Sequence, residues 1–371
     1  MTITSRAAVL FEAPGEWEIV ELQVDEPRDH EVLVRYVTAG LCHSDDHVAK
    51  GDVPMAHLPL CGGHEGAGIV EAVGPGVRNL QVGDHVVAAF IPSCGSCRWC
   101  ASGMQNLCDN GAFMMMGTQL DGTFRLHHNG QDVAQTSLVS TFSEYSVLPE
   151  WGAIKIDRDI PLQTAALVGC GVPTGWGSAV NAAQVRPGDV VIVMGTGGIG
   201  MNAVQGAKHA GASRIIAVDT APFKRESALK LGATDHCETM TQATDLAQSL
   251  TNGQGADSAI VTVGIAEGDH VAQAFGSIRK AGTVVLTAMA NIDESSIPVN
   301  LFELAMFQKR IQGALFGMMS PAAAIPYFLN LYKSGNLLLD ELATKRYSLE
   351  EINTGYADMH AGTNIRGVVD F

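Results

Sequence analysis

The sequence predicts an α/β protein built from a β-rich domain and a second domain with a doubly wound parallel sheet. From about residue 5 to 150 the chain runs in short alternating or apolar stretches separated by Gly, Pro and Asp. That pattern is typical of a strand-rich, barrel-like domain. From about Val172 onward, predicted strands alternate with predicted helices, which indicates a parallel sheet covered by helices. A chain of 371 residues is long enough for each domain to bury its own core.

Each element follows from a local pattern. In the first domain the strand signals are the runs "EVLVRYVTAG", "GAGIVEAVG", "GDHVVAAF" and "FSEYSVLP". In the second domain strands are predicted at 189–195, 214–219, 256–264 and 283–289, and helices at 199–209, 222–233 and 267–282. A helix that starts at a proline, in "SPAAAIPYFLNLYKSG", leads into a last segment ending "NIRGVVDF". We expect this last segment to return to the first domain, so that 1–172 with 318–371 form one domain and 173–317 the other.

Charge and composition restrict the class of partner. The chain has 23 basic and 39 acidic residues, a formal charge of −16, which argues against nucleic acid or an anionic membrane. The N-terminal segment "MTITSRAAVLFEAPGEWEIV" contains no apolar core of signal-peptide length. The longest uncharged apolar stretch, 190–207, is interrupted by "GTGGIG" and is a poor membrane helix. We expect a cytoplasmic protein with no nucleic-acid or membrane partner.

Four of the eight cysteines lie in the fifteen residues "CGSCRWCASGMQNLC". Redox, disulfide and metal roles are all open for such a group. Cytosolic thiols stay reduced, so a dense pattern in a large intracellular chain more often binds metal. Iron–sulfur clusters also take four cysteines, but their usual runs are spaced differently. We therefore predict a closed, structural tetrahedral zinc site, with ligands Cys94, Cys97, Cys100 and Cys108.

The segment "GTGGIG" fits G-x-G-x-x-G between a predicted strand and a predicted helix, with Asp219 closing the next strand. This context predicts a dinucleotide site in which Gly195 permits the turn, Gly197 the approach of the pyrophosphate, and Gly200 the helix–strand packing. The Asp219 carboxylate would accept hydrogen bonds from the hydroxyls of the adenosine ribose and would repel a 2′-phosphate, which favours NAD over NADP. The alternative is a glycine-rich turn without a ligand. The predicted cofactor contacts are Gly195, Gly197, Gly198, Ile199, Gly200, Asp219 and Lys224.

A second group of metal ligands is scattered. Cys42 lies in "AGLCHSDDH", His64 in "CGGHEGAG" and Cys170 in "GCGVPTG". Two thiolates and one imidazole are enough for a catalytic zinc, which takes three protein ligands and leaves a fourth position open. Taken singly, each residue is better explained as a packed core side chain.

The chain resembles the zinc-dependent alcohol dehydrogenases of the medium-chain dehydrogenase/reductase superfamily over essentially all of its length. The resemblance rests on "GHEGAG", the four-cysteine segment, "VGCGVPTGWGSAV", "GTGGIG" with Asp219, and Arg366. It implies a GroES-like catalytic domain and a Rossmann domain with the active site in the cleft between them. It also implies two zinc ions per chain, the catalytic one bound by Cys42, His64 and Cys170 with Glu65 beside it, and a cofactor contact at Arg366.

The family mechanism is implied as well. Zinc acts as a Lewis acid that favours the alkoxide of the bound alcohol, which then gives hydride to the nicotinamide. Ser44 would take the alcohol proton and pass it through the nicotinamide ribose to His47 near the surface. His43 stands where many relatives have an arginine on the pyrophosphate. Ala112 stands where glutathione-dependent formaldehyde dehydrogenases have an arginine, which counts against a thiol-adduct substrate.

Within the family the chain looks most like the actinobacterial nicotinoprotein alcohol dehydrogenases, which are linked to the redox carrier mycofactocin and assayed with artificial nitroso acceptors. This likeness implies a primary alcohol or aldehyde as substrate and an NAD that is not released between turnovers. The segment "LFELAMFQKRIQGALFG" is expected to carry the contact of a homo-oligomer, dimer or tetramer. The alternatives are a thiol-adduct-dependent formaldehyde dehydrogenase and a catalytically silent NAD-binding relative.

Overall fold

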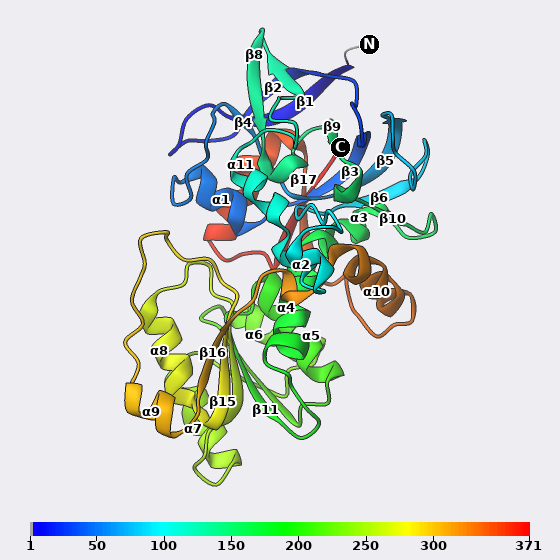
Figure 1. Cartoon of the computed structure of the whole chain (residues 1–371). Coiled ribbons are helices and arrows are strands. Elements are labelled where there is room, and N and C mark those ends of the chain that lie inside the picture. The colour runs from blue at the N-terminus through cyan, green and yellow to red at the C-terminus, as the bar shows by residue number, and fades with distance from the viewer. Residues whose placement is uncertain (1–2) are drawn as a thin grey trace. The chain divides into compact units, whose positions relative to one another are not determined.

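The computed structural model describes residues 3–371, which divide into two compact units (Figure 1). The first unit comprises the chain up to Cys170 together with Met319–Gly335 and Leu339–Phe371, and the second comprises Gly171–Met318 and Asn336–Leu338. The short piece Asn336–Leu338 joins the second unit because the Gln205 side chain accepts from the Leu338 amide (2.8 Å) and donates to its carbonyl (3.0 Å).

The first unit is built on strands. They are β1 (Ile3–Leu10), β2 (Glu18–Val24), β3 (Glu31–Gly40), β4 (Leu60–Cys61), β5 (Glu65–Val73), β6 (His85–Ala88), β7 (Leu126–His128), β8 (Gln131–Gln135), β9 (Tyr145–Pro149), β10 (Ala153–Ile156), β17 (Ala343–Tyr347) and β18 (Arg366–Asp370). A closed barrel forms in the order β1-β2-β7-β8-β4, and a larger sheet in the order β10-β6-β5-β3-β18-β17 with β9 on β3. The expected barrel-like domain is confirmed.

The end of the chain belongs to this unit. Strand β18 pairs antiparallel with β3, with Val368 opposite Gly40 and Val369 opposite Ala39. Both of these β18 valines are fully buried, so the hydrophobic effect fixes this pairing. The helices of the unit are α1 (His43–Ala49), α2 (Arg98–Ala101), α3 (Leu162–Ala165), α10 (Pro321–Lys333) and α11 (Ile352–His360). Helix α10 starts at a proline, as predicted from the sequence.

The second unit is a six-stranded parallel sheet in the order β13-β12-β11-β14-β15-β16, with helices on both faces (Figure 1). In chain order this is 3-2-1-4-5-6, the order of doubly wound dinucleotide-binding folds. The strands are β11 (Val190–Met194), β12 (Arg214–Val218), β13 (Asp235–Cys237), β14 (Ala256–Val261), β15 (Ile278–Leu286) and β16 (Arg310–Gly313). The helices are α4 (Gly171–Gly177), α5 (Gly198–His209), α6 (Pro222–Leu231), α7 (Met240–Leu250), α8 (Gly268–Ser277) and α9 (Leu301–Met306). Every residue of β11 is buried, as expected for a central parallel strand.

One helix is shorter than predicted. A helix was expected over 267–282, but α8 ends at Ser277 and β15 begins at Ile278. Ile278 is buried and pairs with Ala256 of β14, so sheet pairing takes over before the local helical pattern ends. Among the described residues no helix is both long and apolar enough to cross a membrane.

Candidate active site

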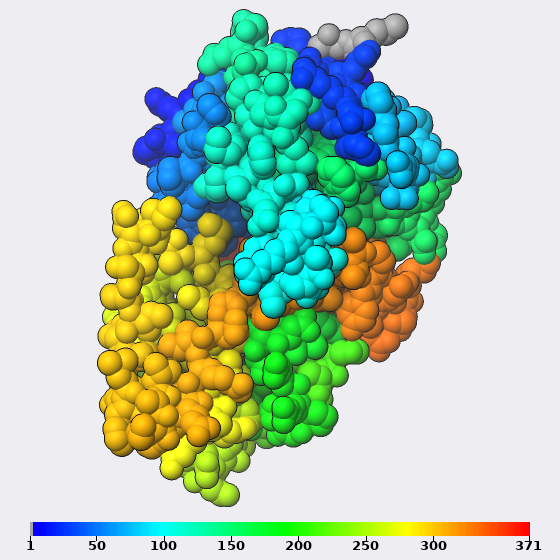
Figure 2. Space-filling model, viewed as in Figure 1, coloured from blue at the N-terminus to red at the C-terminus, as the bar shows by residue number. Residues whose placement is uncertain are grey.

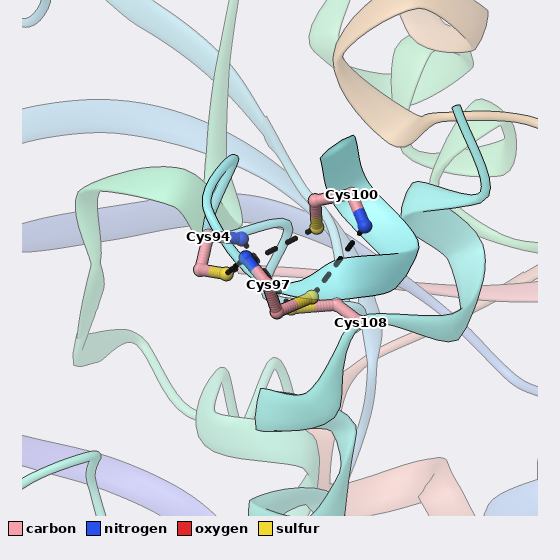
Figure 3. A group of neighbouring side chains, drawn as sticks. All are labelled: Cys94, Cys97, Cys100 and Cys108. Atoms are coloured by element: carbon pink, nitrogen blue, oxygen red, sulfur yellow. Dashed lines mark hydrogen bonds between the residues drawn. The ribbon is translucent and has the colours of Figure 1, made fainter. Parts of the chain in front are cut away.

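The four clustered cysteines point toward a common centre (Figure 3), and their segment, cyan in Figure 2, lies on the surface. Their sulfur atoms lie within 4.8 Å of one another. The Cys94–Cys100 and Cys97–Cys108 sulfur pairs are each 4.0 Å apart. A disulfide requires about 2.05 Å, whereas zinc–sulfur bonds of about 2.3 Å place tetrahedral sulfurs about 3.8 Å apart. The arrangement fits a tetrahedral metal and contains no disulfide.

Backbone amides prepare this cluster for negative charge. The amides of Cys97 and Cys100 donate to the sulfurs of Cys94 (3.4 Å) and Cys97 (3.5 Å). Burial opposes ionisation of Cys94, yet the amides of Ser96 and Cys97 lower its pKa to about 6. Burial raises the pKa of Cys100 to about 12. A divalent cation would allow all four to be thiolates, because metal binding displaces thiol protons.

The second cluster joins three distant parts of the first unit. Cys42 directly precedes α1, His64 and Glu65 lie where β5 begins, and Cys170 follows the short helical turn Ala166–Gly169. One possible ligand atom from each of Cys42, His64, Glu65 and Cys170 lies within 4.8 Å of the others, and all four residues are buried. The sequence-predicted ligands are therefore brought together.

Asp45, a carboxylate that was not predicted as a site residue, lies against His64. Asp45 Oδ2 is 2.9 Å from His64 Nδ1, and Asp45 Oδ1 accepts from the Gly63 amide at 3.0 Å. Burial disfavours the imidazolium, but Asp45 and Cys42 raise the pKa of His64 well above its ordinary value. The signal was the acid-rich run "CHSDDH", since histidine ligands commonly donate their second nitrogen to a carboxylate.

Cys42 and Cys170 interact directly with each other. A hydrogen bond from Cys170 lowers the pKa of Cys42 well below its usual value and raises that of Cys170.

Glu65 lies against Arg366. The two side chains form a buried ion pair, and Arg366 is the first residue of β18. Burial raises the pKa of Glu65 to about 7, although Arg366 acts in the opposite direction. A Cβ on Gly40 would stand 2.3 Å from Glu65 Oε2, so only glycine fits there.

The expectation that His47 lies near the surface is wrong. Its side chain is only 2% exposed, and its Nδ1 is 3.0 Å from Asp52 Oδ2. The reason is the chain reversal after α1, where Gly51 has φ +80° and the Asp52 amide donates to the His47 carbonyl at 2.9 Å. Asp52, which is 26% exposed, is the member of this pair that reaches solvent. On the same helix, Ser44 Oγ is 3.7 Å from Cys42 Sγ and His43 is exposed.

The glycine loop lies between β11 and α5 in the second unit. Gly195 has φ +91°, a conformation that glycine adopts without strain. A Cβ on Gly200 would lie 1.9 Å from the Gly195 carbonyl oxygen, whereas a Cβ on Gly197 would meet nothing within 4 Å. The space beside Gly197, at the start of α5, is therefore open, as the close approach of a pyrophosphate requires.

The predicted ribose contacts lie beside this loop. Asp219 follows β12 and is partly exposed, and its carboxylate accepts from the backbone amide of Thr196 at 2.8 Å. Lys224 lies in the first turn of α6 and is partly exposed. Arg225 donates to the carbonyl oxygens of Asp219 (2.7 Å) and Thr220 (3.0 Å).

The two cysteines outside these groups, Cys61 and Cys237, are buried. Burial raises the pKa of Cys61 to about 12, so its thiol is unreactive.

Comparison with known proteins identifies the family. The family model of the alcohol dehydrogenase GroES-like domain matches residues 28–158, and that of the zinc-binding dehydrogenase matches 198–334. The chain is 50% identical over 365 residues, 98% of each chain, to the NDMA-dependent alcohol dehydrogenase of Amycolatopsis methanolica. It is 48% identical over 363 residues, again 98% of each, to the putative alcohol dehydrogenase D of Mycobacterium tuberculosis. A solved alcohol dehydrogenase zinc-binding domain protein from Burkholderia ambifaria has a TM-score of 0.93 at 33% identity and 100% coverage of both chains.

These matches confirm the resemblance seen in the sequence, including its actinobacterial branch. The chain therefore belongs to the zinc-dependent alcohol dehydrogenases of the medium-chain dehydrogenase/reductase superfamily, which oxidise alcohols with zinc and a nicotinamide cofactor.

Proposed function

We propose that this alcohol dehydrogenase holds two zinc ions per chain and transfers hydride between a primary alcohol, or the matching aldehyde, and NAD. The observation that supports this most directly is the convergence of Cys42, His64 and Cys170, whose ligand atoms lie within 4.8 Å of one another at a buried place. Two cysteines and one histidine are the ligand set known for the catalytic zinc of alcohol dehydrogenases. The four-cysteine cluster would hold the structural zinc.

The residues around the second cluster suit a catalytic metal. When bound, zinc would supply Lewis-acid polarisation of the alcohol oxygen and offer it the fourth coordination position. Asp45 Oδ2 lies 2.9 Å from His64 Nδ1, so Nε2 would be the nitrogen that binds the metal. The Arg366 guanidinium pairs with Glu65, so Glu65 adds little net charge beside the two thiolates.

Ser44 and His47 would move the alcohol proton. Ser44 Oγ lies beside a predicted zinc ligand, 3.7 Å from Cys42 Sγ, where it can accept a proton from a substrate hydroxyl. His47 lies three residues further along α1 and would be the next base. Asp52, paired to His47 Nδ1 at 3.0 Å, orients that imidazole and would be the outlet to solvent.

The second unit supports NAD rather than NADP. The open space at Gly197 gives a pyrophosphate access to the amides of α5. The Asp219 carboxylate stands at the end of β12, where the adenosine ribose binds in this fold, and its charge would repel a 2′-phosphate.

We extend the proposal to retention of the cofactor. The relative from Amycolatopsis methanolica is named as NDMA-dependent, which favours a reaction completed by an added acceptor. In the present chain NAD would stay bound between turnovers, and a second carrier such as mycofactocin would take the hydride. Such retention requires a very small rate of cofactor release.

Exposed apolar side chains favour a homo-oligomer. Leu301, Phe302 and Met306 of α9 are 74%, 66% and 62% exposed, and β16 next to them is the edge of the parallel sheet. Exposed apolar groups beside an open sheet edge are a ready surface for self-association.

The test uses full-length protein purified without added metal or nucleotide. We expect about two zinc ions per chain by elemental analysis, NAD released on denaturation, and alcohol turnover that needs an artificial acceptor rather than free NAD. If the protein is purified without cofactor and turns over readily with added NAD, cofactor retention is disproved, but the proposed alcohol dehydrogenase activity stands. Activity found only with formaldehyde and glutathione would favour the thiol-adduct enzyme, although Ala112 supplies no cation for such an adduct. Absence of any turnover with two zinc ions bound would favour a catalytically silent relative.

A further inference from the structure

Thr196, the second residue of the glycine loop, makes an unusual pair of contacts with Asp219. Its backbone amide and its side-chain hydroxyl both donate to the same carboxylate oxygen, Oδ2, at 2.8 and 3.1 Å. The Thr196 side chain is fully buried, so its hydroxyl has no access to water that could replace the carboxylate. Because threonine is branched at Cβ, its χ1 angle is also restricted.

The sheet explains why the two residues meet. Strands β11 and β12 are parallel neighbours, with Met194 opposite Val218, and the Gly195 amide continues the pairing by donating to the Val218 carbonyl at 2.8 Å. Thr196 and Asp219 therefore lie side by side, each just beyond the carboxyl end of its strand. The nucleotide binds at this edge in doubly wound folds.

The remaining contacts determine how the carboxylate is presented. Asp219 Oδ1 accepts from the Ala221 amide at 2.9 Å. A carboxylate has about four acceptor positions, so one remains on Oδ1 and none on Oδ2. The donors from Thr196 and Ala221 are all neutral, and among residues 3–371 no side-chain cation pairs with this carboxylate. Its position is therefore fixed by neutral donors.

Arg225, in the first turn of α6, is bonded to the backbone. Arg225 donates from one nitrogen to the carbonyl oxygens of Asp219 and Thr220 at 2.7 and 3.0 Å. A guanidinium near this position is what would accommodate a 2′-phosphate in an NADP enzyme. Here the Arg225 guanidinium is bonded to two backbone carbonyls, and one acceptor position of the Asp219 carboxylate stays open.

We propose that Thr196 is a specificity-determining positioning residue, which clamps Asp219 Oδ2 so that Oδ1 and the negative charge meet the adenosine ribose and exclude a 2′-phosphate. This rests on the proposed use of NAD and deepens it. Without the hydroxyl, the Asp219 carboxylate would keep only the backbone amides of Thr196 and Ala221. It would be held less firmly, would bind the ribose less well and would exclude the 2′-phosphate less strictly. The effect is on the choice between the two dinucleotides and not on the assembly of the loop.

The experiment measures the dissociation constants of NADH and NADPH by nicotinamide fluorescence, on full-length protein freed of nucleotide. Thr196→Val removes only the hydroxyl, and Thr196→Ser keeps it. We expect Thr196→Val to weaken NADH binding and to reduce the preference for NADH over NADPH by about 5- to 10-fold, the range of one typical hydrogen bond, because the two backbone donors to Asp219 remain. Thr196→Ser should restore the wild-type preference. In an Asp219→Gly background, which lacks the carboxylate, Thr196→Val should change the preference no further.

Thr262→Val is the matched control. The Thr262 hydroxyl is also at the loop, where it donates to the Gly195 carbonyl at 2.5 Å and the Met194 carbonyl at 3.1 Å. Its loss should change NADH and NADPH affinities equally. If Thr196→Val behaves like Thr262→Val, or leaves the preference unchanged while Asp219→Gly abolishes it, the role of Thr196 is refuted and that of Asp219 stands. If the wild-type protein shows no preference for NADH, the proposed choice of NAD over NADP is itself wrong.

Discussion

The glycine loop allows a test in which two neighbouring Gly→Ala substitutions have opposite effects. A Cβ on Gly200 would stand 1.9 Å from the Gly195 carbonyl oxygen and 2.8 Å from Thr262 Oγ1. That carbonyl cannot swing away freely, because it accepts from the Thr262 hydroxyl at 2.5 Å and the Thr196 amide of the same peptide group donates to Asp219 at 2.8 Å. A Cβ on Gly197 would meet nothing within 4 Å, and its φ of −77° suits alanine.

The magnitudes follow from these contacts. Overpacking against rigid atoms costs about 3 kcal/mol at the upper end of its usual range, and alanine regains about 1 kcal/mol in a helix. Gly200→Ala should therefore lower the free energy of unfolding by about 2 kcal/mol, or the melting temperature by about 4–8 °C for a unit of this size. Gly197→Ala should melt like the wild type but bind NADH about 10-fold more weakly or worse, because its methyl group fills the place of the pyrophosphate.

The assay combines thermal unfolding of full-length protein with NADH binding by fluorescence. A Gly200→Ala protein as stable as the wild type would contradict the close packing of α5 on β11. A Gly197→Ala protein with unchanged NADH affinity would show that this loop is not the nucleotide site.

Three further predictions concern the metals, the proton path and the assembly. Cys100→Ser should lower stability and zinc content together, because a structural zinc contributes folding free energy, whereas Cys170→Ser should remain folded but inactive; equal melting temperatures for the two variants would contradict separate roles. His47→Gln should slow turnover by about 10-fold, mainly at and below neutral pH, and an unchanged pH–rate profile would remove His47 from the proton path. Phe302→Ser should reduce the molecular mass measured by light scattering if α9 carries the subunit contact, and an unchanged mass would place that contact elsewhere.

Local patterns in the sequence were sufficient for the class of fold and for the kinds of ligand. The buried strand β11, the loop "GTGGIG" and helix α5 are contiguous, so spacing alone predicts how they follow one another. The same holds for Cys94, Cys97, Cys100 and Cys108, whose sulfurs converge because they lie in one short segment. For Cys42, His64 and Cys170 the sequence indicated the residues only through the family resemblance, because no local rule joins positions so far apart.

The tertiary structure decided which side chains contact the predicted site residues. Asp45 reaches His64, and Thr196 reaches Asp219, through pairings between segments distant in the chain. His47 was expected near the surface and is buried, because the turn at Gly51 returns Asp52 over the imidazole. Helix α8 stops at Ser277 because Ile278 is required in the sheet beside Ala256. Sequence periodicity reports which face of an element is buried, whereas partners and exposure depend on what the rest of the chain packs against that face.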